Sequence, residues 1–372
     1  MILLVAGTRP NFMKVAPVYR ALTSRGRETK LLHTGQHFDA AMSDVFFRDL
    51  GLPNPHVTLK GGGGTHAEQT AAILVGVEKA LLEDRPEVIV VVGDVTSTLS
   101  AALAAAQLGI PVVHVESGLR SRDWTMPEEI NRILTDQLSD LLLTPSPDAA
   151  PNLLAEGIPK ERIVFVGNVM IDSLRWALRK QTDVLARLNL EARSYALATL
   201  HRPANVDNAE ALNATLDALA AVAKRVPVLF PVHPRTTARA EALGLSARLT
   251  STPNLRTVEP FGYDDFVTLM ANAKLVATDS GGIQEETTAL GVPCLTLRGG
   301  TERPITVTEG TNEVVGLDVP KIAAAVDAIV SGKGKQGRVP DGWDGRAGER
   351  VADAIEAFLK GTPPPRTKGP RA

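Results

Sequence analysis

Short, uninterrupted runs of aliphatic and β-branched residues recur along this chain, and each is followed by a turn and a helical pattern. In the first half these runs cover residues 2–6, 88–92, 112–115 and 141–144. A continuous apolar run predicts a strand buried on both faces, and strands that alternate with helices predict a parallel sheet between two helical layers. The turns that leave such strands lie along one edge of the sheet, where ligands bind.

The same pattern starts again in the second half of the chain. Its apolar runs cover residues 195–200, 228–230 and 275–278. A chain of 372 residues is also too long for one ordinary core. We therefore predict an α/β protein of two Rossmann-like, doubly wound domains, residues 1–168 and 169–344, that face each other across a cleft. We expect the last helix, residues 345–360, to pack back on the first domain and the proline-rich residues 361–372 to be disordered.

The composition excludes several classes of partner. The formal net charge is −2 and charged residues make up 22% of the chain, so nothing predicts binding to nucleic acid or to an anionic membrane. The sequence has no run of 18 apolar residues, so we expect no membrane span. Cys294 is the single cysteine, which excludes a disulfide within the chain and is typical of a reducing compartment. We therefore expect a cytoplasmic protein.

The segment at residues 279–286, Asp-Ser-Gly-Gly-Ile-Gln-Glu-Glu, predicts a phosphate site. It follows a strand and opens a helix, with Ser280 as the expected N-cap. Gly281 and Gly282 leave backbone N–H groups open to an anion, and the helix dipole favours a diphosphate there. Glu286 is better placed to accept hydrogen bonds from sugar or ribose hydroxyls. The alternative is an ordinary capped helix with acidic residues in its first turn.

A second turn, after the first strand, supplies positive charge. Residues 7–11 read Gly-Thr-Arg-Pro-Asn, and Lys14 lies about one helical turn beyond Arg9. Both cations suit a phosphate group, although solvated surface cations are the alternative. Because this turn is not a G-x-G-x-x-G loop, it argues against a nicotinamide cofactor.

Three acids in the first half predict proton transfer. Asp94 and Glu116 follow strands, and Glu128 follows a proline that opens a helix. Asp94 could instead cap a helix, and Glu128 could interact with the helix dipole. Glu116 has no such simple explanation, since a carboxylate at a buried strand end needs a partner or a task. Carboxylates grouped at one sheet edge suit the abstraction and delivery of a proton.

The histidines predict an anion contact and no metal site. His201 follows the first strand of the second half and could contact a phosphate or a departing oxygen, or could be structural. No H-E-x-x-H motif is present, and Gly35 between His33 and His37 keeps that pair from sharing a helix face. We expect no metal and no cofactor. Without a G-x-S-x-G motif or a base near Cys294, a covalent hydrolase is also not expected.

Taken together and in order, these segments resemble the non-hydrolysing UDP-N-acetylglucosamine 2-epimerases. The match runs from residue 7 to residue 304 and so covers most of the chain. Each segment alone is a weak signal, and the ordered set is specific. The matching segments are residues 7–10 with Lys14, 34–37, 93–94, 114–120, 127–132, 201–202, 279–286 and 301–304.

The resemblance implies a glycosyltransferase-B-like fold, a homodimer and a role in making cell-surface polysaccharides. It implies reversible conversion of UDP-N-acetylglucosamine to UDP-N-acetylmannosamine by anti elimination of UDP, a glycal intermediate and re-addition of UDP. Asp94, Glu116 and Glu128 match the proton-transfer positions, and His201 matches a residue near the phosphates. The positions that match nucleotide-binding residues, with Glu286 on the ribose, are Arg9, Lys14, Ser280, Gly281, Gly282, Glu286 and Arg303.

The sequence departs from the family pattern in two places. Many members read His-Arg-x-Glu-Asn, and here Ala204 replaces the glutamate. Gln36 and His37 match a region that binds a second, activating UDP-N-acetylglucosamine, and the residues after them differ from those of many members. Several alternatives therefore remain: a hydrolysing epimerase that releases N-acetylmannosamine and UDP, an epimerase of a related UDP-diacetamido-uronic acid, a sugar transferase, and a sensor without activity.

Overall fold

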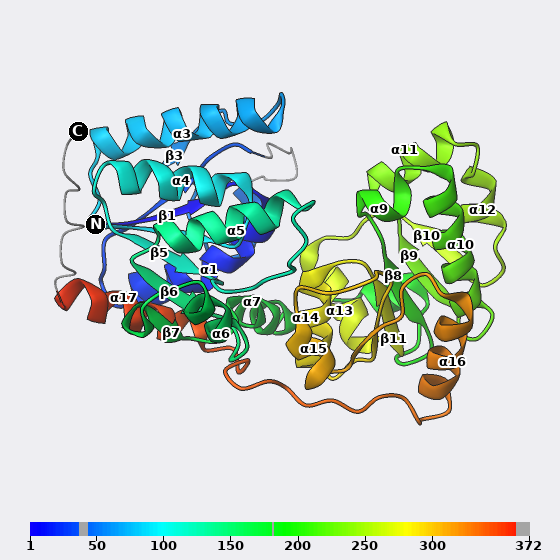
Figure 1. The fold of residues 1–372 in the computed structure, drawn as a ribbon. Helices are drawn as coiled ribbons and strands as arrows, with labels where there is room; N and C mark the ends of the chain where they lie inside the picture. Colours follow the sequence, from blue (N-terminus) through cyan, green and yellow to red (C-terminus); the bar gives the residue numbers. More distant parts are fainter. Residues whose placement is uncertain (37–43, 181, 362–372) are drawn as a thin grey trace. The chain divides into compact units, whose positions relative to one another are not determined.

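The computed structural model describes residues 1–36, 44–180 and 182–361. Its contacts divide the chain into two compact units (Figure 1): unit 1, Met1–Ser173 with Asp341–Ala372, and unit 2, Leu174–Pro340. A compact unit is not by itself a domain that folds on its own, so the predicted domains, residues 1–168 and 169–344, stay predictions. The predicted disorder at the C-terminus concerns residues 362–372, which lie outside the described residues.

Within the described residues, unit 1 contains a sheet of seven parallel strands in the order β3-β2-β1-β4-β5-β6-β7. The order reverses direction between β1 and β4, which is the point where doubly wound sheets bind ligands. The strands are β1 Ile2–Ala6, β2 Thr29–His33, β3 Val57–Thr58, β4 Val88–Val92, β5 Val112–Val115, β6 Leu141–Thr144 and β7 Ile163–Phe165.

Helices cover both faces of this sheet. Those of unit 1 are α1 Arg9–Ser24, α2 Asp44–Asp49, α3 His66–Glu83, α4 Thr96–Gln107, α5 Pro127–Leu138, α6 Ala149–Ala155, α17 Ala347–Lys360 and the 3₁₀ turn Lys160–Arg162. Helices α3, α4 and α5 pack side by side (Figure 1), and Leu3 and Val5 of β1 join the core beneath α3 and α4. Since side chains alternate along a strand, Ile2 and Leu4 point to the opposite face, where α1 lies.

The C-terminal helix belongs to unit 1, although it is far from α1 in sequence. Helices α1 and α17 pack against each other, and a Cβ atom at Gly348 would lie 2.8 Å from the carbonyl oxygen of Pro17. The Arg25 side chain also donates to the backbone oxygen of Glu349 at 3.0 Å. Glycine at position 348 therefore permits a close approach of the two helices.

Unit 2 repeats this architecture within the described residues, with six parallel strands in the order β10-β9-β8-β11-β12-β13. Here the order reverses between β8 and β11. The strands are β8 Ala196–Thr199, β9 Val228–Pro231, β10 Leu255–Val258, β11 Leu275–Thr278, β12 Cys294–Thr296 and β13 Asn312–Val314. The helices are α8 Val184–Leu188, α9 Pro203–Val206, α10 Ala209–Ala223, α11 Pro234–Ala242, α12 Ser246–Ser251, α13 Tyr263–Asn272, α14 Gly281–Leu290, α15 Pro304–Thr308 and α16 Val319–Val330.

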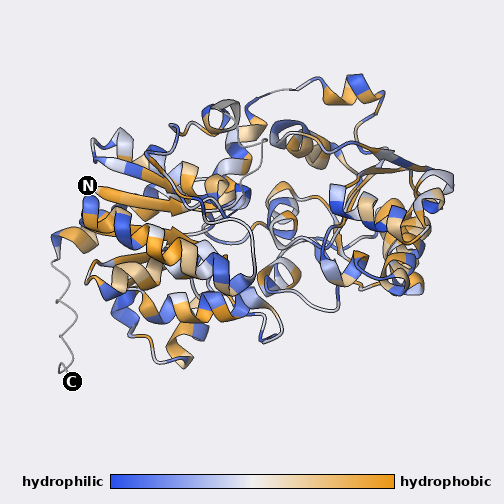
Figure 2. Cartoon of the chain, turned by 90° about the horizontal axis from the view of Figure 1, so that it is seen from above, coloured by the Kyte–Doolittle hydropathy of each residue, from blue (hydrophilic) through white to orange (hydrophobic). Residues whose placement is uncertain are grey.

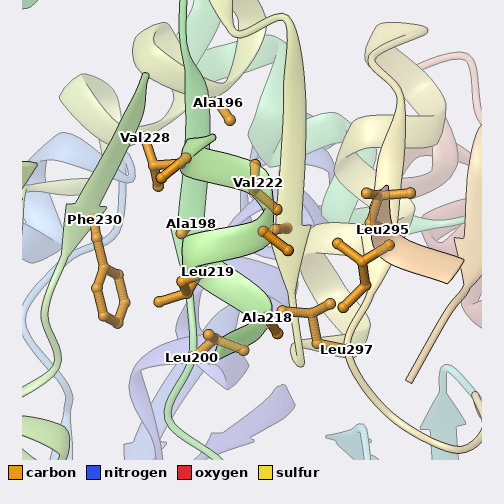
Figure 3. Close-up of a cluster of buried hydrophobic side chains, with 14 of the residues drawn as sticks. Ala196, Ala198, Leu200, Ala218, Leu219, Val222, Val228, Phe230, Leu295 and Leu297 are labelled. Carbon is orange, nitrogen blue, oxygen red and sulfur yellow. The ribbon is translucent and has the colours of Figure 1, made fainter. Parts of the chain in front are cut away.

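Both cores follow from the apolar strands. In Figure 2 the strand beside the N-terminus is coloured as hydrophobic, whereas the helices carry both hydrophobic and hydrophilic turns, as expected for elements with one solvated face. Figure 3 shows the core of unit 2, where Leu219 and Val222 of α10 lie close to Phe230 of β9 and to Leu295 and Leu297 near β12. In the part of the chain that the structure describes, no helix has both the length and the apolar content that crossing a membrane requires.

These observations confirm the predicted α/β class with two Rossmann-like, doubly wound sheets. Strands β4, β5, β6 and β11 begin and end where the apolar runs predicted. Helix α1 begins at Arg9, directly after the turn that follows β1, because Thr8 and Asn11 form a capping box and Pro10 suits the first helical turn. The helix α7, Val169–Leu178, contains the boundary between the units. The cleft expected between the domains stays a prediction.

Candidate functional site

Asn11 holds together the two loops where the sheet order of unit 1 reverses. Its side-chain oxygen accepts hydrogen bonds from the backbone N–H groups of Gly7 (3.3 Å) and Thr8 (3.2 Å), and its amide donates to the carbonyl oxygen of Val92 (3.2 Å). The turn after β1 is thereby tied to the end of β4. Arg9, predicted to bind phosphate, is the first residue of α1 beside this junction and is partly buried.

Glu116 and Lys14 form a buried ion pair at this sheet edge. The Nζ atom of Lys14 lies 2.7 Å from Oε2 of Glu116, and the two side chains are 11% and 2% exposed. Glu116 adopts a left-handed backbone conformation (φ 70°) directly after β5. Lys14 is therefore no solvated surface cation. Its charge offsets the cost of burying the predicted proton-transfer acid.

Asp94 is an ion-pair partner and does not cap a helix. The N-cap of α4 is Val95, so the capping alternative for Asp94 is wrong. Its carboxylate pairs with the Arg132 guanidinium, and its carbonyl oxygen accepts a hydrogen bond from the Asn131 amide at 3.0 Å. Because both partners lie on α5, this helix fixes the position of the acid that follows β4.

The two glutamates in the first turn of α5 have different surroundings. Glu129 is buried, and it accepts hydrogen bonds from the N–H groups of Ser121 (2.9 Å) and Arg122 (2.8 Å) and pairs with Arg132. Burial would raise the pKa of Glu129, but these donors hold it below its ordinary value. Glu128 is partly exposed, and no described residue pairs with its carboxylate. Glu129 is thus a structural residue, and Glu128 presents an open carboxylate.

Gln36, predicted for an activator site, is engaged with α4. Its side-chain oxygen accepts hydrogen bonds from the Ser97 N–H (3.0 Å) and from the Ser97 hydroxyl (2.6 Å). His37, the other residue of that prediction, lies outside the described residues. The prediction of an activator site stays untested.

In unit 2, Asp279 organises the loop that carries His201. The fully buried carboxylate accepts hydrogen bonds from the N–H groups of His201 (3.1 Å) and Arg202 (2.9 Å) and from the Asn205 amide (3.1 Å). Burial would raise the pKa of Asp279, but the contact with His201 and these N–H donors hold it below its ordinary value. The imidazole Nδ1 of His201 lies 3.2 Å from Oδ1 of Asp279, and its side chain is 41% exposed. Asp279 therefore orients an accessible imidazole.

Ser280 stands at the N-cap of α14, but its side chain makes no capping hydrogen bond. The Ser280 hydroxyl therefore accepts no hydrogen bond from the first N–H groups of α14. The prediction that Ser280 is the N-cap residue is confirmed. A Cβ atom at Gly282 would meet nothing within 4 Å, whereas at Gly281 it would lie 2.5 Å from Oε1 of Glu302. The start of α14 combines open space at one glycine with a carboxylate beside the other.

Glu302 is a buried anion among arginines. Its carboxylate lies 3.0 Å from the Arg298 guanidinium and 3.4 Å from that of Arg202. Burial would raise the pKa of Glu302, yet the charges of Arg303, Arg298 and Arg202 lower it to about 2. Three cations thus gather near the start of α14, where the sequence predicted a phosphate site.

Arg303 and Glu286, which were also predicted to bind the nucleotide, each have a partner in the structure. Arg303 is 6% exposed, and its Nε lies 2.8 Å from Oε1 of Glu285. Glu286 is 2% exposed and accepts a hydrogen bond from the Tyr263 hydroxyl at 2.6 Å. Burial raises the pKa of Glu286 to about 7, against the lowering effect of the Tyr263 hydrogen bond. The predicted contact of Glu286 with ribose stays a prediction.

Several buried charged residues near the sheet edge of unit 1 were not among the predicted site residues. Arg132 lies one helical turn after Glu128, a spacing that places both on one face of α5 and could have drawn attention to it. Asp136 lies one turn further, and it is fully buried, as is His114. Among the described residues, no group of three or more histidine, cysteine or acidic side chains is placed to hold a metal ion.

Comparison with known proteins settles the family. The family model described as UDP-N-acetylglucosamine 2-epimerase matches residues 20–356. The chain belongs to this family. A UDP-N-acetylglucosamine 2-epimerase of Methanocaldococcus jannaschii is 42% identical over 355 residues, which cover 94% of this chain and 96% of the relative. A UDP-2,3-diacetamido-2,3-dideoxy-D-glucuronate 2-epimerase of Pseudomonas aeruginosa is 40% identical over 364 residues, covering 95% and 99%.

A solved structure of this epimerase family has the same fold. The crystal structure of the M. jannaschii UDP-GlcNAc 2-epimerase in complex with UDP-GlcNAc and UDP matches with a TM-score of 0.88 and 41% identity, covering 96% of this chain and 99% of that one. The fold class implied by the resemblance, glycosyltransferase-B-like with two Rossmann-like sheets, is therefore confirmed.

Proposed function

We propose that this chain is an isomerase that interconverts UDP-N-acetylglucosamine and UDP-N-acetylmannosamine by epimerisation at C2, without releasing free sugar. A base removes the C2 proton, UDP leaves from C1 to give a glycal, and UDP adds back while C2 receives a proton on the other face. The family and the 42% identity to a UDP-N-acetylglucosamine 2-epimerase support this substrate.

The observation that carries the proposal is the convergence of three acid-bearing segments in unit 1. Strands β4 and β5 are paired neighbours, so Asp94 and Glu116 leave the sheet at the same edge. Helix α5, which carries Glu128 in its first turn, reaches Asp94 through Arg132. Two carboxylates with different cationic partners and one open carboxylate suit a reaction that needs a base and an acid at one carbon.

In unit 2, the start of α14 suits the UDP leaving group. Its N–H groups and the nearby arginines would stabilise the charge that develops on the diphosphate as the C1–O bond breaks. We assign proton transfer to Asp94, Glu116 and Glu128, with His201 near the phosphates. The proposed nucleotide-binding residues are Arg9, Lys14, Ser280, Gly281, Gly282, Glu286 and Arg303.

Incubation of the protein with UDP-N-acetylglucosamine in heavy water tests the proposal. We expect the recovered UDP-sugars to carry deuterium at C2, because the removed proton is replaced from solvent. Free N-acetylmannosamine and UDP as the products would identify a hydrolysing epimerase. A UDP-sugar that binds but gains no deuterium would contradict epimerase activity on this substrate.

A second candidate substrate is a UDP-2,3-diacetamido-uronic acid. The 40% identity to the P. aeruginosa enzyme, over 95% of this chain, favours it almost as strongly as the first substrate. Deuterium incorporation measured side by side with both UDP-sugars decides between them, and the substrate with the higher kcat/KM is the physiological class.

Several wider assignments are also proposals. A homodimer in the cytoplasm that supplies sugar units for cell-surface polysaccharides is supported by the family resemblance and by the single buried cysteine. The division into an acid-bearing domain and a nucleotide-binding domain is supported by the two compact units. Gln36 and His37 are proposed to contact an activating nucleotide sugar, and light scattering and activation kinetics would test these assignments.

A further inference from the structure

A buried polar network lies behind the three acids of unit 1, and none of its members has been assigned a role above. It consists of His114 on β5, Asp136 on α5 and Arg120 in the loop after β5, and we call it the His114 network. His114 and Asp136 are fully buried, and Arg120 is 7% exposed. Buried charged groups of this kind are costly unless every one of them is paired.

Both ring nitrogens of His114 are engaged. Its Nε2 lies 2.8 Å from the carbonyl oxygen of Gly93, and its Nδ1 lies 2.6 Å from Oδ1 of Asp136. The other carboxylate oxygen, Oδ2, accepts a hydrogen bond from the Gly118 N–H at 3.1 Å and pairs with the Arg120 guanidinium at 2.7 Å. Arg120 pairs in turn with Glu156 at 2.6 Å.

The hydrogen-bond pattern requires a proton on each side of the ring. A carbonyl oxygen can only accept, so Nε2 must donate to Gly93. A second proton must lie between Nδ1 and the Asp136 carboxylate, because two lone pairs would otherwise face each other at 2.6 Å. The charges of His114, Arg120, Asp136 and Glu156 sum to zero whether this proton resides on the ring or on the carboxylate. In either case Nε2 of His114 donates to the Gly93 carbonyl oxygen.

The contacts of the network reach each acid-bearing segment. Gly93 directly precedes Asp94, and Gly118 lies two residues after Glu116. Gly93 and Gly118 have left-handed backbone conformations (φ 68° and 81°), so these loops turn sharply at the points that the network holds. Asp136 lies on the helix that begins near Glu128.

We propose that His114 is a positioning residue for proton transfer: its Nε2–H group holds the Gly93 carbonyl, and so places Asp94 relative to Glu116. The inference rests on the proposed epimerase function. The ring nitrogens of His114 bond to the Gly93 carbonyl and to Asp136, so His114 acts through the acids and not on the sugar. A misplacement of about 1 Å in a reacting group can reduce the rate about 100-fold, which sets the size of the expected effect.

Two substitutions separate positioning from simple stabilisation. In His114→Gln the side-chain amide can take the place of Nε2 and keep the bond to Gly93, while the contact with Asp136 is lost. In His114→Asn the amide can take the place of Nδ1 and keep the bond to Asp136, while Gly93 is released. The glutamine variant leaves the buried Asp136 carboxylate with one hydrogen-bond partner fewer, so we expect it to be the less stable of the two.

We expect activity to rank in the opposite order to stability. For His114→Asn, kcat for C2 deuterium exchange should fall about 10- to 100-fold with KM changed less than about twofold, which is the pattern of a misplaced catalytic group. For His114→Gln, which keeps the bond to Gly93, kcat should fall no more than about threefold. If kcat follows the urea midpoint in both variants, or if His114→Asn keeps the wild-type kcat, the positioning role is refuted.

The wild-type protein provides the control on the proposed function. If it exchanges no C2 proton, the epimerase assignment fails and the kinetic comparison is void, but nuclear magnetic resonance of ¹⁵N-histidine protein still tests the network. We expect Nε2 of His114, assigned by its loss in His114→Gln, to carry the proton that is donated to the Gly93 carbonyl. An unprotonated Nε2 would overturn the inference independently of activity.

Discussion

Replacing Glu286 by glutamine is expected to stabilise the ligand-free protein above neutral pH. Glutamine has nearly the same shape and can still accept the hydrogen bond from the Tyr263 hydroxyl, which lies 2.6 Å from the carboxylate. It cannot ionise, however, and the site is 2% exposed. The substitution therefore removes the cost of holding a buried negative charge.

The size and pH range of the effect follow from the pKa. The pKa of Glu286 is about 7 in the folded protein, against an ordinary value of 4.5. Between these values the folded state keeps a proton that the unfolded state has lost, so the free energy of unfolding falls as pH rises through this window. At about 1.4 kcal/mol for each tenfold change in proton affinity, the full cost above pH 7 is about 3 kcal/mol. Below pH 4.5 both states are protonated and the gain disappears.

Urea titrations followed by circular dichroism, at about pH 8 and about pH 4, measure this gain as a difference in unfolding free energy. Glu286→Gln should unfold at higher urea than wild type at the upper pH and at the same urea at the lower pH. The same variant should bind UDP more weakly if Glu286 contacts the ribose. A lower urea midpoint at the upper pH, or an equal gain at both, would refute the reasoning.

Glu302 provides a matched control with the opposite sign. It is also a buried glutamate of unit 2, but arginines lower its pKa to about 2. A depressed pKa stabilises the folded protein above the ordinary value of 4.5, and this contribution is lost as pH falls toward 2. Glu302→Gln should therefore cost about 3 kcal/mol at neutral pH, with little change down to pH 4.5.

Further predictions concern the acids and the glycines of α14. Glu116→Gln should abolish deuterium exchange at C2 while UDP affinity, measured by calorimetry, changes less than about threefold; normal turnover would contradict the assignment. Gly281→Ala should lower the free energy of unfolding by about 1–3 kcal/mol, because the new methyl group would overlap Glu302. Gly282→Ala should leave it unchanged or raise it by up to about 1 kcal/mol, because nothing lies within 4 Å of the new methyl group. Equal stability of the two glycine variants would show that the crowding at Gly281 has no cost.

The parts of the fold that could be predicted are the strands whose limits depend on hydrophobicity alone. Strands β4, β5 and β11 are continuous apolar runs buried on both faces, and their limits follow directly from the sequence. Strands β7 and β13, each of three residues, were not predicted. Edge strands of this kind are less buried and short, so they carry too few apolar residues to stand out from loops.

The candidate site was predictable in its location but not in its pairings. That acids follow β4 and β5 could be read from the order of apolar runs and turns. Which cation each acid meets depends on tertiary packing, and so neither the pairing of Lys14 with Glu116 nor that of Arg132 with Asp94 could be derived. The buried His114 was counted only as part of a strand, since a polar residue within an apolar run gives no sign of its partners.

Because α17 completes unit 1 although it follows unit 2 in the sequence, unit 1 cannot be completed until unit 2 has been synthesised. Unit 2 is one continuous stretch, residues 174–340, and it emerges from the ribosome before residues 347–360 do. The face of α1 that receives α17 therefore stays uncovered until residues 347–360 have been synthesised. A nonsense mutation just before residue 347 would thus damage the unit whose first residues were synthesised first.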